Sequence, residues 1–397
     1  PWIKFLHRQN HNIILVDPNE IPYCIGYCDV FFQCDVKNSN RIRQFIEENG
    51  YDVDFFTSDQ TDASTISVAQ LSDYFGTRSN SLEAVERFSD KYVSREFINQ
   101  KFGNHHLPKY AKVSNTQDLK KFQDDLREDI IVKPTDSQSS RGIFVVGKND
   151  DPQMFLEQIE ESLVGSRNNY LIAEEFIKGT EITIEGVVTE FGHKILAASR
   201  KKHFRTGIAS DLEYPLDITT GLWDKISNFY NKIINSTGLR LGLTHTEFLI
   251  NFETEQFYLV EMACRGGGTL IPSDIVNWVS GISPYQIFYH QLTRNETQVL
   301  DKLIPETRAA KLHFFEFPSG KVEQIYGVEK ARNISGVHRL EFEFECGDCI
   351  QPACNDRGRQ GFVIIKGETS EEVLKIQKKV YETIGVEYTK DEKLALC

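Results

Sequence analysis

The segment Thr244–Gly268, with the sequence THTEFLINFETEQFYLVEMACRGGG, constrains this chain more than any other. Two apolar stretches, Thr244–Asn251 and Gln256–Ala263, flank a polar turn and predict a β-hairpin. Glu247 and Glu261 stand 14 residues apart on these two strands, and a hairpin can bring both carboxylates to one end of a sheet. Carboxylates and phosphate oxygens are the hard ligands that Mg²⁺ prefers. The segment therefore predicts a magnesium and phosphate site.

Arg265 follows Glu261 by four residues and precedes Gly266–Gly268. A guanidinium donates hydrogen bonds in pairs, which suits a carboxylate or a developing acyl phosphate. Glycines let the backbone approach a ligand closely. The alternative interpretation is a structural ion pair between Arg265 and one of the two glutamates.

A second candidate is the stretch Ile131–Gly142, with the sequence IVKPTDSQSSRG. A strand ends at Lys133, a small polar loop follows, and another strand begins at Gly142. Backbone N–H groups and hydroxyls of such a loop can close over phosphates, while Lys133 supplies a positive charge. A β-hairpin with a solvated loop is the alternative.

A third candidate is the stretch Ala173–Glu181, with the sequence AEEFIKGTE. The backbone of a strand that runs into a short linker can hydrogen-bond an adenine edge, and nearby carboxylates suit the adenine amino group and ribose hydroxyls. An acidic pair of strands on a solvated face explains the stretch equally well.

Hydrophobic periodicity predicts the elements around these motifs. The first 90 residues or so alternate between strand and helix patterns, which favours a parallel sheet with covering helices. The last 90 or so predict a smaller α+β unit. The expected strands include Asn12–Asp17, Val53–Ser58, Ala310–Phe317, Arg339–Cys346 and Gly361–Lys366, and the expected helices include Asn40–Asn49, Ser81–Phe102 and Ser370–Ile384. The first residues, Pro1–Gln9, resemble the end of a helix more than a first strand.

Lys91 in a Ser-Asp-Lys sequence, the Lys-Pro hairpin, the Glu-Glu-Phe-Ile strand and the Glu…Glu-x-x-x-Arg-Gly-Gly segment occur in the order typical of the ATP-grasp superfamily. The chain resembles its carboxylate–amine ligase branch, which includes bacterial L-amino acid ligases, and is similar to the carbamoyl-phosphate synthetase large chain. The resemblance implies an α/β and α+β architecture with an ATP-grasp fold. A Rossmann-like pre-ATP-grasp domain would span 1–90, the ATP-grasp domain 91–307 with a lid at about 111–177, and a small C-terminal α+β domain 308–397.

The resemblance also implies an ATP site. Lys91 and Lys133 would hold the phosphates, and Glu174 would contact the adenine amino group. The backbone of Glu175, Phe176 and Ile177 would line the adenine slot, and Glu181 would bind the ribose. The loop Thr135–Gly142, with Ser139, Ser140 and Gly142, would cover the phosphates.

The remaining implied roles concern the metal and the chemistry. Glu247 and Glu261 would bridge Mg²⁺ ions, with Mn²⁺ as a substitute, and Arg265 would steady the substrate carboxylate and the acyl phosphate. Lys202 or His203 would contact the region of the γ-phosphate; a solvated basic end of a strand is the alternative.

Two positions depart from the family pattern. Many relatives carry Asn two residues after the second metal-binding glutamate, where this chain has Ala263. The loop Thr135–Arg141 contains no glycine, whereas biotin carboxylase-like relatives are glycine-rich there. The second departure argues against a biotin carboxylase.

The predicted function is an ATP-dependent carboxylate–amine ligase that forms an acyl phosphate and releases ADP and phosphate. One alternative is carboxyphosphate chemistry on bicarbonate, as in carbamoyl-phosphate synthetase. Another is an ATP-binding module without catalysis, which Ala263 favours. A dinucleotide-binding dehydrogenase is excluded because no G-x-G-x-x-G motif occurs.

The net charge of −13 argues against nucleic acid and anionic membrane surfaces as partners, because like charges repel. No apolar run approaches the roughly 20 residues that span a bilayer. The first residues carry no leader-like pattern, so a cytoplasmic location is expected, with small-molecule carboxylate and amine substrates. Relatives are often dimers, which makes a homodimer an expectation.

Overall fold

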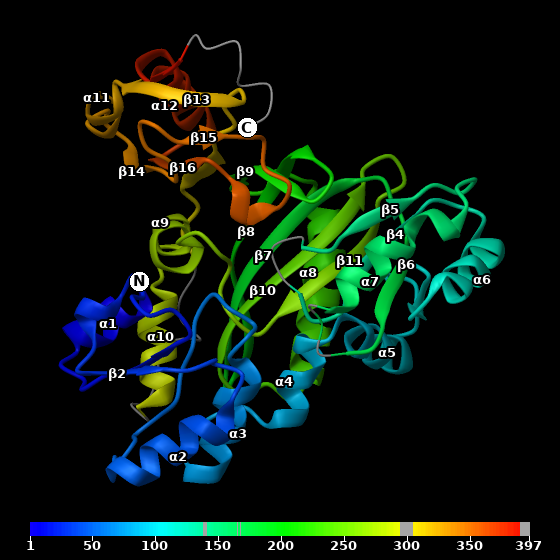
Figure 1. Cartoon of the computed structure of the whole chain (residues 1–397), viewed down its shortest axis with the longest axis horizontal. Coiled ribbons are helices and arrows are strands. Elements are labelled where there is room, and N and C mark those ends of the chain that lie inside the picture. Colours follow the sequence, from blue (N-terminus) through cyan, green and yellow to red (C-terminus); the bar gives the residue numbers. More distant parts are fainter. Residues whose placement is uncertain (138–140, 165, 167, 294–304, 390–397) are drawn as a thin grey trace.

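The computed structural model describes residues 1–397 except 138–140, 165, 167, 294–304 and 390–397 (Figure 1). Its centre is an eight-stranded sheet in the order β11-β10-β7-β8-β9-β12-β16-β14. A four-stranded sheet, β3-β6-β4-β5, forms a separate lobe beside it. Among the described helices, none is both long and apolar enough to cross a membrane.

The N-terminal part is mainly helical and has one small parallel sheet, β1-β2. Its elements are α1 (Trp2–Arg8), β1 (Ile14–Asp17), η1 (Ile25–Tyr27), β2 (Val30–Gln33), α2 (Ser39–Asn49), α3 (Thr65–Phe75), α4 (Leu82–Ser89) and α5 (Lys91–Phe102). The strand expected over Val53–Ser58 is absent from the described sheets. Its apolar side chains are partly buried against two different cores instead, since Phe55 packs on the main core and Phe56 on the small core under β1 and β2.

The helix expected over Ser81–Phe102 is two helices, α4 and α5, which meet at Asp90. Asp90 adopts an extended backbone, and its carboxylate accepts hydrogen bonds from the N–H groups of Tyr92 and Val93. The first N–H groups of a helix have no carbonyl partner within the helix, and a capping aspartate accepts their hydrogen bonds. Asp90 therefore favours the start of a second helix at this point. Lys91 therefore occupies the first turn of α5.

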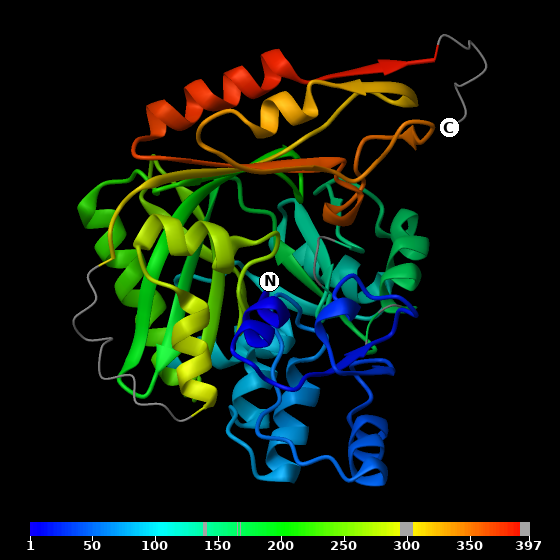
Figure 2. The same cartoon turned by 90° about the vertical axis from the view of Figure 1, so that its left-hand side faces the viewer.

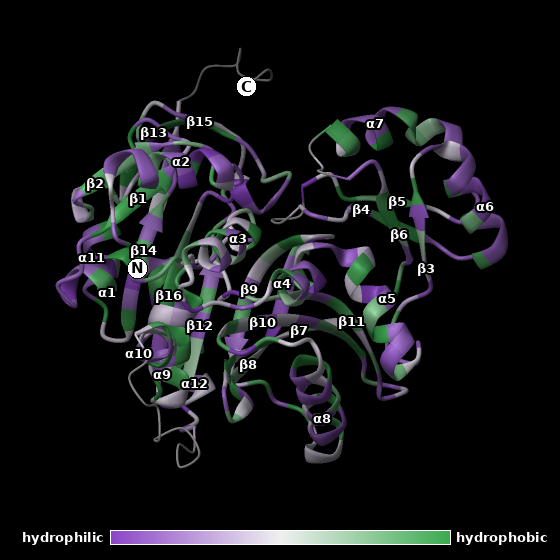
Figure 3. Cartoon of the chain, turned by 90° about the horizontal axis from the view of Figure 1, so that it is seen from below, coloured by the Kyte–Doolittle hydropathy of each residue, from purple (hydrophilic) through white to green (hydrophobic). Residues whose placement is uncertain are grey.

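The lobe that contains the four-stranded sheet lies within the stretch predicted to be the lid. Its elements are β3 (Tyr110–Val113), α6 (Thr116–Leu126), β4 (Ile130–Pro134), β5 (Phe144–Val146), η2 (Pro152–Phe155), α7 (Leu156–Val164) and β6 (Leu171–Glu175). Figure 3 shows this lobe set apart from the rest, with hydrophobic strands and a largely hydrophilic outer helix, α6. It has its own apolar core around Leu119, Val132 and Ile159.

The central sheet is covered on both faces. Its first part contains β7 (Thr180–Thr189), β8 (Gly192–Arg205), β9 (Ile208–Tyr214), α8 (Thr220–Ser236), β10 (Gly242–Asn251), β11 (Gln256–Ala263), the π-helix η3 (Ile271–Val276), α9 (Asn277–Ser280) and α10 (Pro284–Leu292). Ile184 and Val188 of β7 pack with α8, whereas Val187 packs with η3, α9 and α10. This alternation is the one that a strand buried on both faces requires.

The C-terminal part was expected to be a separate unit, but three of its strands extend the central sheet. Its elements are β12 (Ala309–Phe314), β13 (Gly320–Tyr326), α11 (Val328–Arg332), β14 (Val337–Phe342), β15 (Cys349–Ile350), η5 (Asp356–Gly358), β16 (Gly361–Gly367), α12 (Ser370–Thr383) and β17 (Gly385–Tyr388). Strand β12 pairs with β9, so the hydrogen-bonded sheet continues past the predicted boundary. Figure 2 shows α11 and α12 on the outer side of these strands.

Candidate active site

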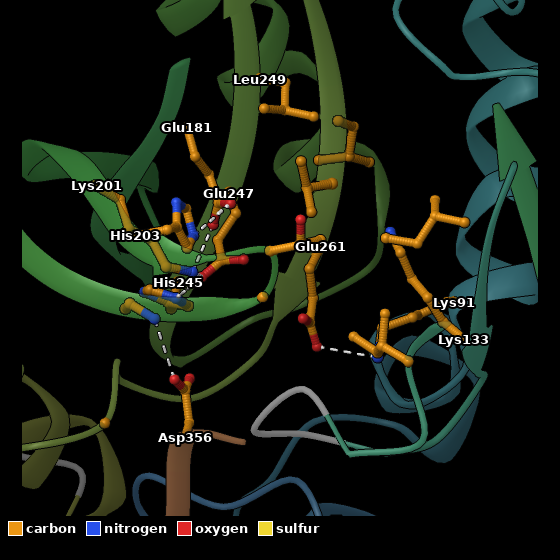
Figure 4. A pocket seen from close by; sticks show the side chains of 18 of the residues that line it. Lys91, Lys133, Glu181, Lys201, His203, His245, Glu247, Leu249, Glu261 and Asp356 are labelled. Atoms are coloured by element: carbon orange, nitrogen blue, oxygen red, sulfur yellow. Dashed lines mark hydrogen bonds and ion pairs between the residues drawn. The ribbon is translucent and has the colours of Figure 1, made fainter. Parts of the chain in front are cut away.

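A cavity of about 590 Å³ lies where the lobe with the four-stranded sheet, here called the lid lobe, meets the central sheet and the C-terminal part. Figure 4 shows Lys91 and Lys133 on the right, a charged group from the central sheet on the left with Glu261 between them, and Asp356 below the charged group. Most of the site residues expected from the sequence line this cavity: Lys91, Lys133, Glu174, Glu175, Phe176, Ile177, Glu181, His203, Glu247, Glu261 and Arg265. Residues far apart in the chain are thus brought together at one place.

Glu247 and Glu261 are cross-strand partners on β10 and β11, as the hairpin pattern predicts. A Lys201 Nζ–Glu247 Oε1 distance of 2.7 Å and a Lys91 Nζ–Glu261 Oε1 distance of 3.2 Å give each carboxylate a lysine partner. Burial alone would raise the pKa of Glu247, but the charges of Lys201 and His245 outweigh burial and hold that pKa well below its ordinary value. Glu247 is therefore an anion at neutral pH.

Strand β8 brings alternate side chains to the cavity. Lys201 pairs with both Glu181 and Glu247, and His203 Nε2 lies 3.2 Å from Glu181 Oε2. Lys202, which the sequence proposed beside His203, does not line the cavity. It is half exposed and pairs with Glu213 at 2.8 Å, because neighbouring residues of a strand point to opposite faces. The cavity lysine of this strand is Lys201.

This placement predicts different results at the two neighbouring lysines. Lys201→Met should lower kcat/KM for ATP roughly 10- to 100-fold, because Glu181 and Glu247 lose a shared charge-assisted hydrogen-bond donor. Lys202→Met should stay within about twofold, because exposed ion pairs contribute little. Steady-state phosphate release at varied ATP concentration measures both variants. Equal losses in the two variants would contradict the assignment.

Glu174 lies at the centre of a buried ion-pair network. Its Oε1 is 2.7 Å from Arg95 Nε and its Oε2 is 2.8 Å from Lys133 Nζ. Arg95 and Glu174 are fully buried, and Arg95 also donates to the Val260 carbonyl at 2.6 Å. Burial would raise the pKa of Glu174, but Arg95 and Lys133 lower it below its ordinary value. Both carboxylate oxygens of Glu174 thus hold cations, a role that the sequence did not predict.

Lys91 connects helix α5 to the loop after β4. Its backbone N–H donates to the Thr135 carbonyl at 2.9 Å, and its Nζ donates to the Ser137 carbonyl at 2.8 Å. Gly142, where this loop ends, has φ +68° and does not line the cavity. A Cβ there would lie 2.9 Å from Pro134, so both backbone conformation and packing require glycine. The predicted loop residues Ser139 and Ser140 lie outside the described residues.

Arg265 binds an aspartate of the N-terminal part through its fork. Nε and Nη2 lie 2.9 and 2.8 Å from the two carboxylate oxygens of Asp62. The alternative stated from the sequence was an ion pair with one of the two glutamates, and the partner is instead 203 residues away in the chain. Arg265 reaches the cavity already oriented by Asp62.

The three glycines after Arg265 serve different purposes. A Cβ on Gly266 would lie 2.5 Å from Pro272, and one on Gly267 would lie 2.9 Å from Ile271 and 3.1 Å from His245. Gly268 lines the cavity and has no heavy atom within 4 Å of its added Cβ. The first two glycines are explained by packing, and only Gly268 leaves open space for a ligand.

Asp59, in the N-terminal part of the chain, makes the stability of the fold depend on pH. Its carboxylate accepts a hydrogen bond from the Tyr285 hydroxyl, while its Oδ1 is shielded from solvent without a partner among the described residues. Burial raises the pKa of Asp59 from 3.8 to about 6. The charged form therefore destabilises the fold, and this penalty develops as the pH rises from about 4 through 6.

Asp59→Asn should therefore stabilise the protein by roughly 1–3 kcal/mol at about pH 8 and change its stability little near pH 4. Asparagine keeps an acceptor for Tyr285 but cannot ionise. Denaturant unfolding of the variant and the wild type at both pH values checks this. A stability difference that does not change with pH would contradict it.

The sequence analysis missed several residues of the site or their partners. Lys201 could have been found, because it lies two residues from His203 on the same strand and therefore faces the same side. His245 lies two residues from Glu247 on the same face of β10, and its Nδ1 is 2.6 Å from Glu185 Oε1. Asp62 and Arg95 carry no local signal, because their partners are distant in the chain.

Two family profiles match this chain. A profile described as an ATP-grasp domain matches residues 126–273, and one described as an L-amino acid ligase C-terminal domain 2 matches residues 313–389. Together with the charged cavity, the first match shows that residues 126–273 form an ATP-grasp domain. The second match shows that residues 313–389 resemble the C-terminal domain 2 of L-amino acid ligases.

Two characterised relatives are similar in sequence. Phosphoribosylamine–glycine ligase of Methanococcus vannielii is 31% identical over 107 residues, which cover 24% of this chain and 24% of the relative. The chain thus matches only about a quarter of that protein's length. Dapdiamide A synthase of Enterobacter agglomerans is 22% identical over 316 residues, which cover 72% of this chain and 69% of the relative.

Solved structures share the whole fold. L-amino acid ligase from Bacillus licheniformis has a TM-score of 0.81 and 18% identity, and the match covers 98% of this chain and 95% of that one. Phosphoribosylglycinamide synthetase from Anaerococcus prevotii has a TM-score of 0.74 and 20% identity, and the match covers 98% of this chain and 96% of that one. At this level of identity the likeness establishes the fold alone.

Proposed function

We propose that this chain is an ATP-dependent ligase that joins the carboxylate of an amino acid-type substrate to an amine through an acyl phosphate. The observation that carries the proposal is the pair Glu247 and Glu261, which are cross-strand partners in one cavity with Lys91, Lys133 and Lys201. The L-amino acid ligase C-terminal domain supports the substrate class. A cytoplasmic location and a homodimer stay predictions.

The donor set fits Mg²⁺. Glu247 and Glu261 offer carboxylate oxygens from adjacent strands, and Mg²⁺ commonly takes one or two carboxylates and completes its octahedron with phosphate oxygens and water. Ala263 removes a further ligand that many relatives have, so nucleotide oxygens or water would fill that position. When bound, Mg²⁺ would offset the negative charge that gathers on the transferred phosphoryl group.

The nucleotide would lie between the lid lobe and the central sheet. Lys91 and Lys133 would hold its phosphates, and the backbone of Glu175–Ile177 would contact the adenine. Since Arg95 and Lys133 occupy both oxygens of Glu174, we assign Glu174 the role of holding Lys133 in position. Glu181 would bind the ribose hydroxyls.

The reaction has two displacements. A carboxylate oxygen of the acid attacks the γ-phosphorus in line, which breaks the bond to the β-phosphate oxygen and releases ADP. The amine nitrogen then attacks the acyl carbon, phosphate leaves with the electron pair of the C–O bond, and the nitrogen loses a proton. Arg265, fixed by Asp62, would steady the acyl phosphate. A closed lid would keep water from hydrolysing it.

The test is release of ADP and phosphate from Mg-ATP with panels of carboxylates and amines, offered singly and in pairs. Release that requires both an acid and an amine supports the ligase. Release with bicarbonate alone would favour carboxyphosphate chemistry. ATP binding without release for any pair would favour a module that binds ATP without catalysis.

A further inference from the structure

The junction between helix α5 and the lid lobe sets the relative position of Lys91, which α5 carries, and Lys133, which the lobe carries. The lid lobe has an apolar core of its own, and the described members of this core all come from the lobe. The position of the lobe relative to α5 therefore depends on the contacts at the junction rather than on one continuous core. One of these contacts is the buried pair of Arg95 and Glu174. A second contact lies at the start of α5, next to Lys91.

Asp90 is the centre of this second contact. Its Oδ1 accepts hydrogen bonds from the backbone N–H groups of Tyr92 at 2.7 Å and Val93 at 3.0 Å. Its Oδ2 accepts hydrogen bonds from the Asn168 amide at 2.6 Å and the Tyr170 hydroxyl at 2.9 Å. Asn168 and Tyr170 belong to the lid lobe and lie just before β6. One oxygen of the carboxylate thus caps α5, and the other binds the lid lobe.

The same contact reaches the loop after β4, which is the loop expected to cover the phosphates. The Asn168 amide also donates to Thr135 Oγ1 at 2.8 Å, and the Thr135 carbonyl accepts the backbone N–H of Lys91 at 2.9 Å. The Nζ of Lys91 donates to the Ser137 carbonyl of this loop at 2.8 Å. Hydrogen bonds therefore lead from Asp90 through Asn168 and Thr135 back to Lys91, the next residue of the chain. Loss of the contact between Asp90 and the lobe would release the loop from Lys91.

Aromatic rings brace the same junction. Lys112 of β3 places its Nζ 4.5 Å from the ring centroid of Tyr92 and 4.2 Å from that of Tyr170. The two rings meet edge to face, with their centroids 6.0 Å apart. Burial, and then the hydrogen bond to Asp90, raise the pKa of Tyr170 above its ordinary value. The Tyr170 hydroxyl therefore keeps its proton at neutral pH and donates it to Asp90.

We propose that Asp90 is a positioning residue, which holds the lid lobe against α5 so that Lys133 and the loop after β4 face Lys91 across the phosphates of ATP. Asp90 does not itself line the cavity, so it acts through Lys91 and the loop. Cationic groups stabilise a transferring phosphoryl group only where they are held in the right geometry. This inference rests on the proposed ligase function and adds a residue that prepares its site for phosphoryl transfer.

Asp90→Ser separates the two roles of the carboxylate. Serine is a preferred N-cap residue, so its hydroxyl still accepts an N–H of the first turn of α5. Its side chain is shorter, and a serine that caps α5 cannot also reach Asn168 and Tyr170. The matched control is Asp151→Ser, because Asp151 is an exposed residue of the lid lobe that caps η2 by accepting the N–H of Gln153 at 3.0 Å.

We expect Asp90→Ser to weaken binding of the non-hydrolysable ATP analogue adenylyl imidodiphosphate with Mg²⁺ roughly 10-fold, because misplaced lysines lose charge-assisted hydrogen bonds to phosphate. Calorimetric titration measures the Kd. Asp151→Ser should stay within about twofold of the wild type. Asp90→Ser combined with Tyr170→Phe should bind no more weakly than Asp90→Ser alone, because both changes remove the same hydrogen bond. A lower unfolding temperature with wild-type affinity in Asp90→Ser would show that Asp90 contributes to stability alone, and that result would overturn the inference.

Hydrogen exchange without nucleotide separates this inference from the ligase proposal. The backbone N–H of Lys91 donates to the Thr135 carbonyl, so its exchange rate measured by NMR reports opening of the junction. The rate should be at least about tenfold higher in Asp90→Ser and unchanged in Asp151→Ser. If the wild type turned over no pair of substrates, this result together with weakened nucleotide binding would support the inference although the ligase proposal fails. Equal exchange rates in Asp90→Ser and the wild type would overturn the inference, whatever the enzyme turns over.

Discussion

Glu247→Gln is expected to lower acid- and amine-dependent phosphate release roughly 10²- to 10³-fold, the order of effect of removing one electrostatic stabiliser from an active site. Glutamine has the same shape but no charge. The cavity would lose an anionic metal ligand, and Lys201 would keep only Glu181 as its ion-pair partner. Initial rates of phosphate release at saturating substrates measure the effect, and thermal unfolding of the variant shows whether it is folded.

Glu253→Gln is the matched control, because Glu253 is exposed in the turn of the same hairpin. It should retain wild-type turnover within about twofold, as surface substitutions usually do. If Glu247→Gln also retained turnover within about threefold, the metal role of Glu247 would be wrong. If the wild type bound ATP without turnover and the variant changed only the affinity, the chain would be a binding module.

Arg95→Leu is expected to lower the free energy of unfolding by about 3–5 kcal/mol, the usual cost of breaking a buried ion pair from one side. Arg95 is fully buried and joins α5 to Glu174 on β6 and to the Val260 carbonyl on β11. Without it, the buried carboxylate of Glu174 keeps only Lys133. Denaturant unfolding followed by circular dichroism measures the loss.

Two comparisons make this result specific. Gln100→Leu places the same residue on an exposed position of α5 and should change stability by less than about 0.5 kcal/mol. The double variant Arg95→Leu with Glu174→Leu should recover part of the loss, because it removes the carboxylate that was left with one partner. A single variant as stable as the wild type would show that the ion pair contributes no net stability.

The hairpin of the site and the placement of its two glutamates could be predicted, because both depend on residues close together in the sequence. The hairpin Thr244–Ala263 and its glutamates follow from two apolar strands, a polar turn and a fixed spacing. Lys202 was misplaced because one residue along a strand reverses the direction of a side chain. Its neighbour Lys201 takes the place in the cavity.

The N- and C-terminal parts were harder to predict. The pattern over Val53–Ser58 is apolar enough for a strand, but whether a stretch pairs depends on a neighbouring edge that only the folded chain provides. The strands β12, β14 and β16 were expected in a unit of their own, and they joined the edge of the central sheet that β9 offers.

By itself, the sequence predicted the hairpin with its two glutamates, because periodicity and spacing act over a few residues, and its resemblance to the ATP-grasp superfamily implied the class of fold. The tertiary structure alone decided which charges meet. Arg95 contacts Glu174 at a separation of 79 residues, and Asp62 orients Arg265 at a separation of 203 residues. Such pairs leave no periodic trace in a single sequence. Their geometry is set by how the lobes pack, and it controls the electrostatics of the cavity.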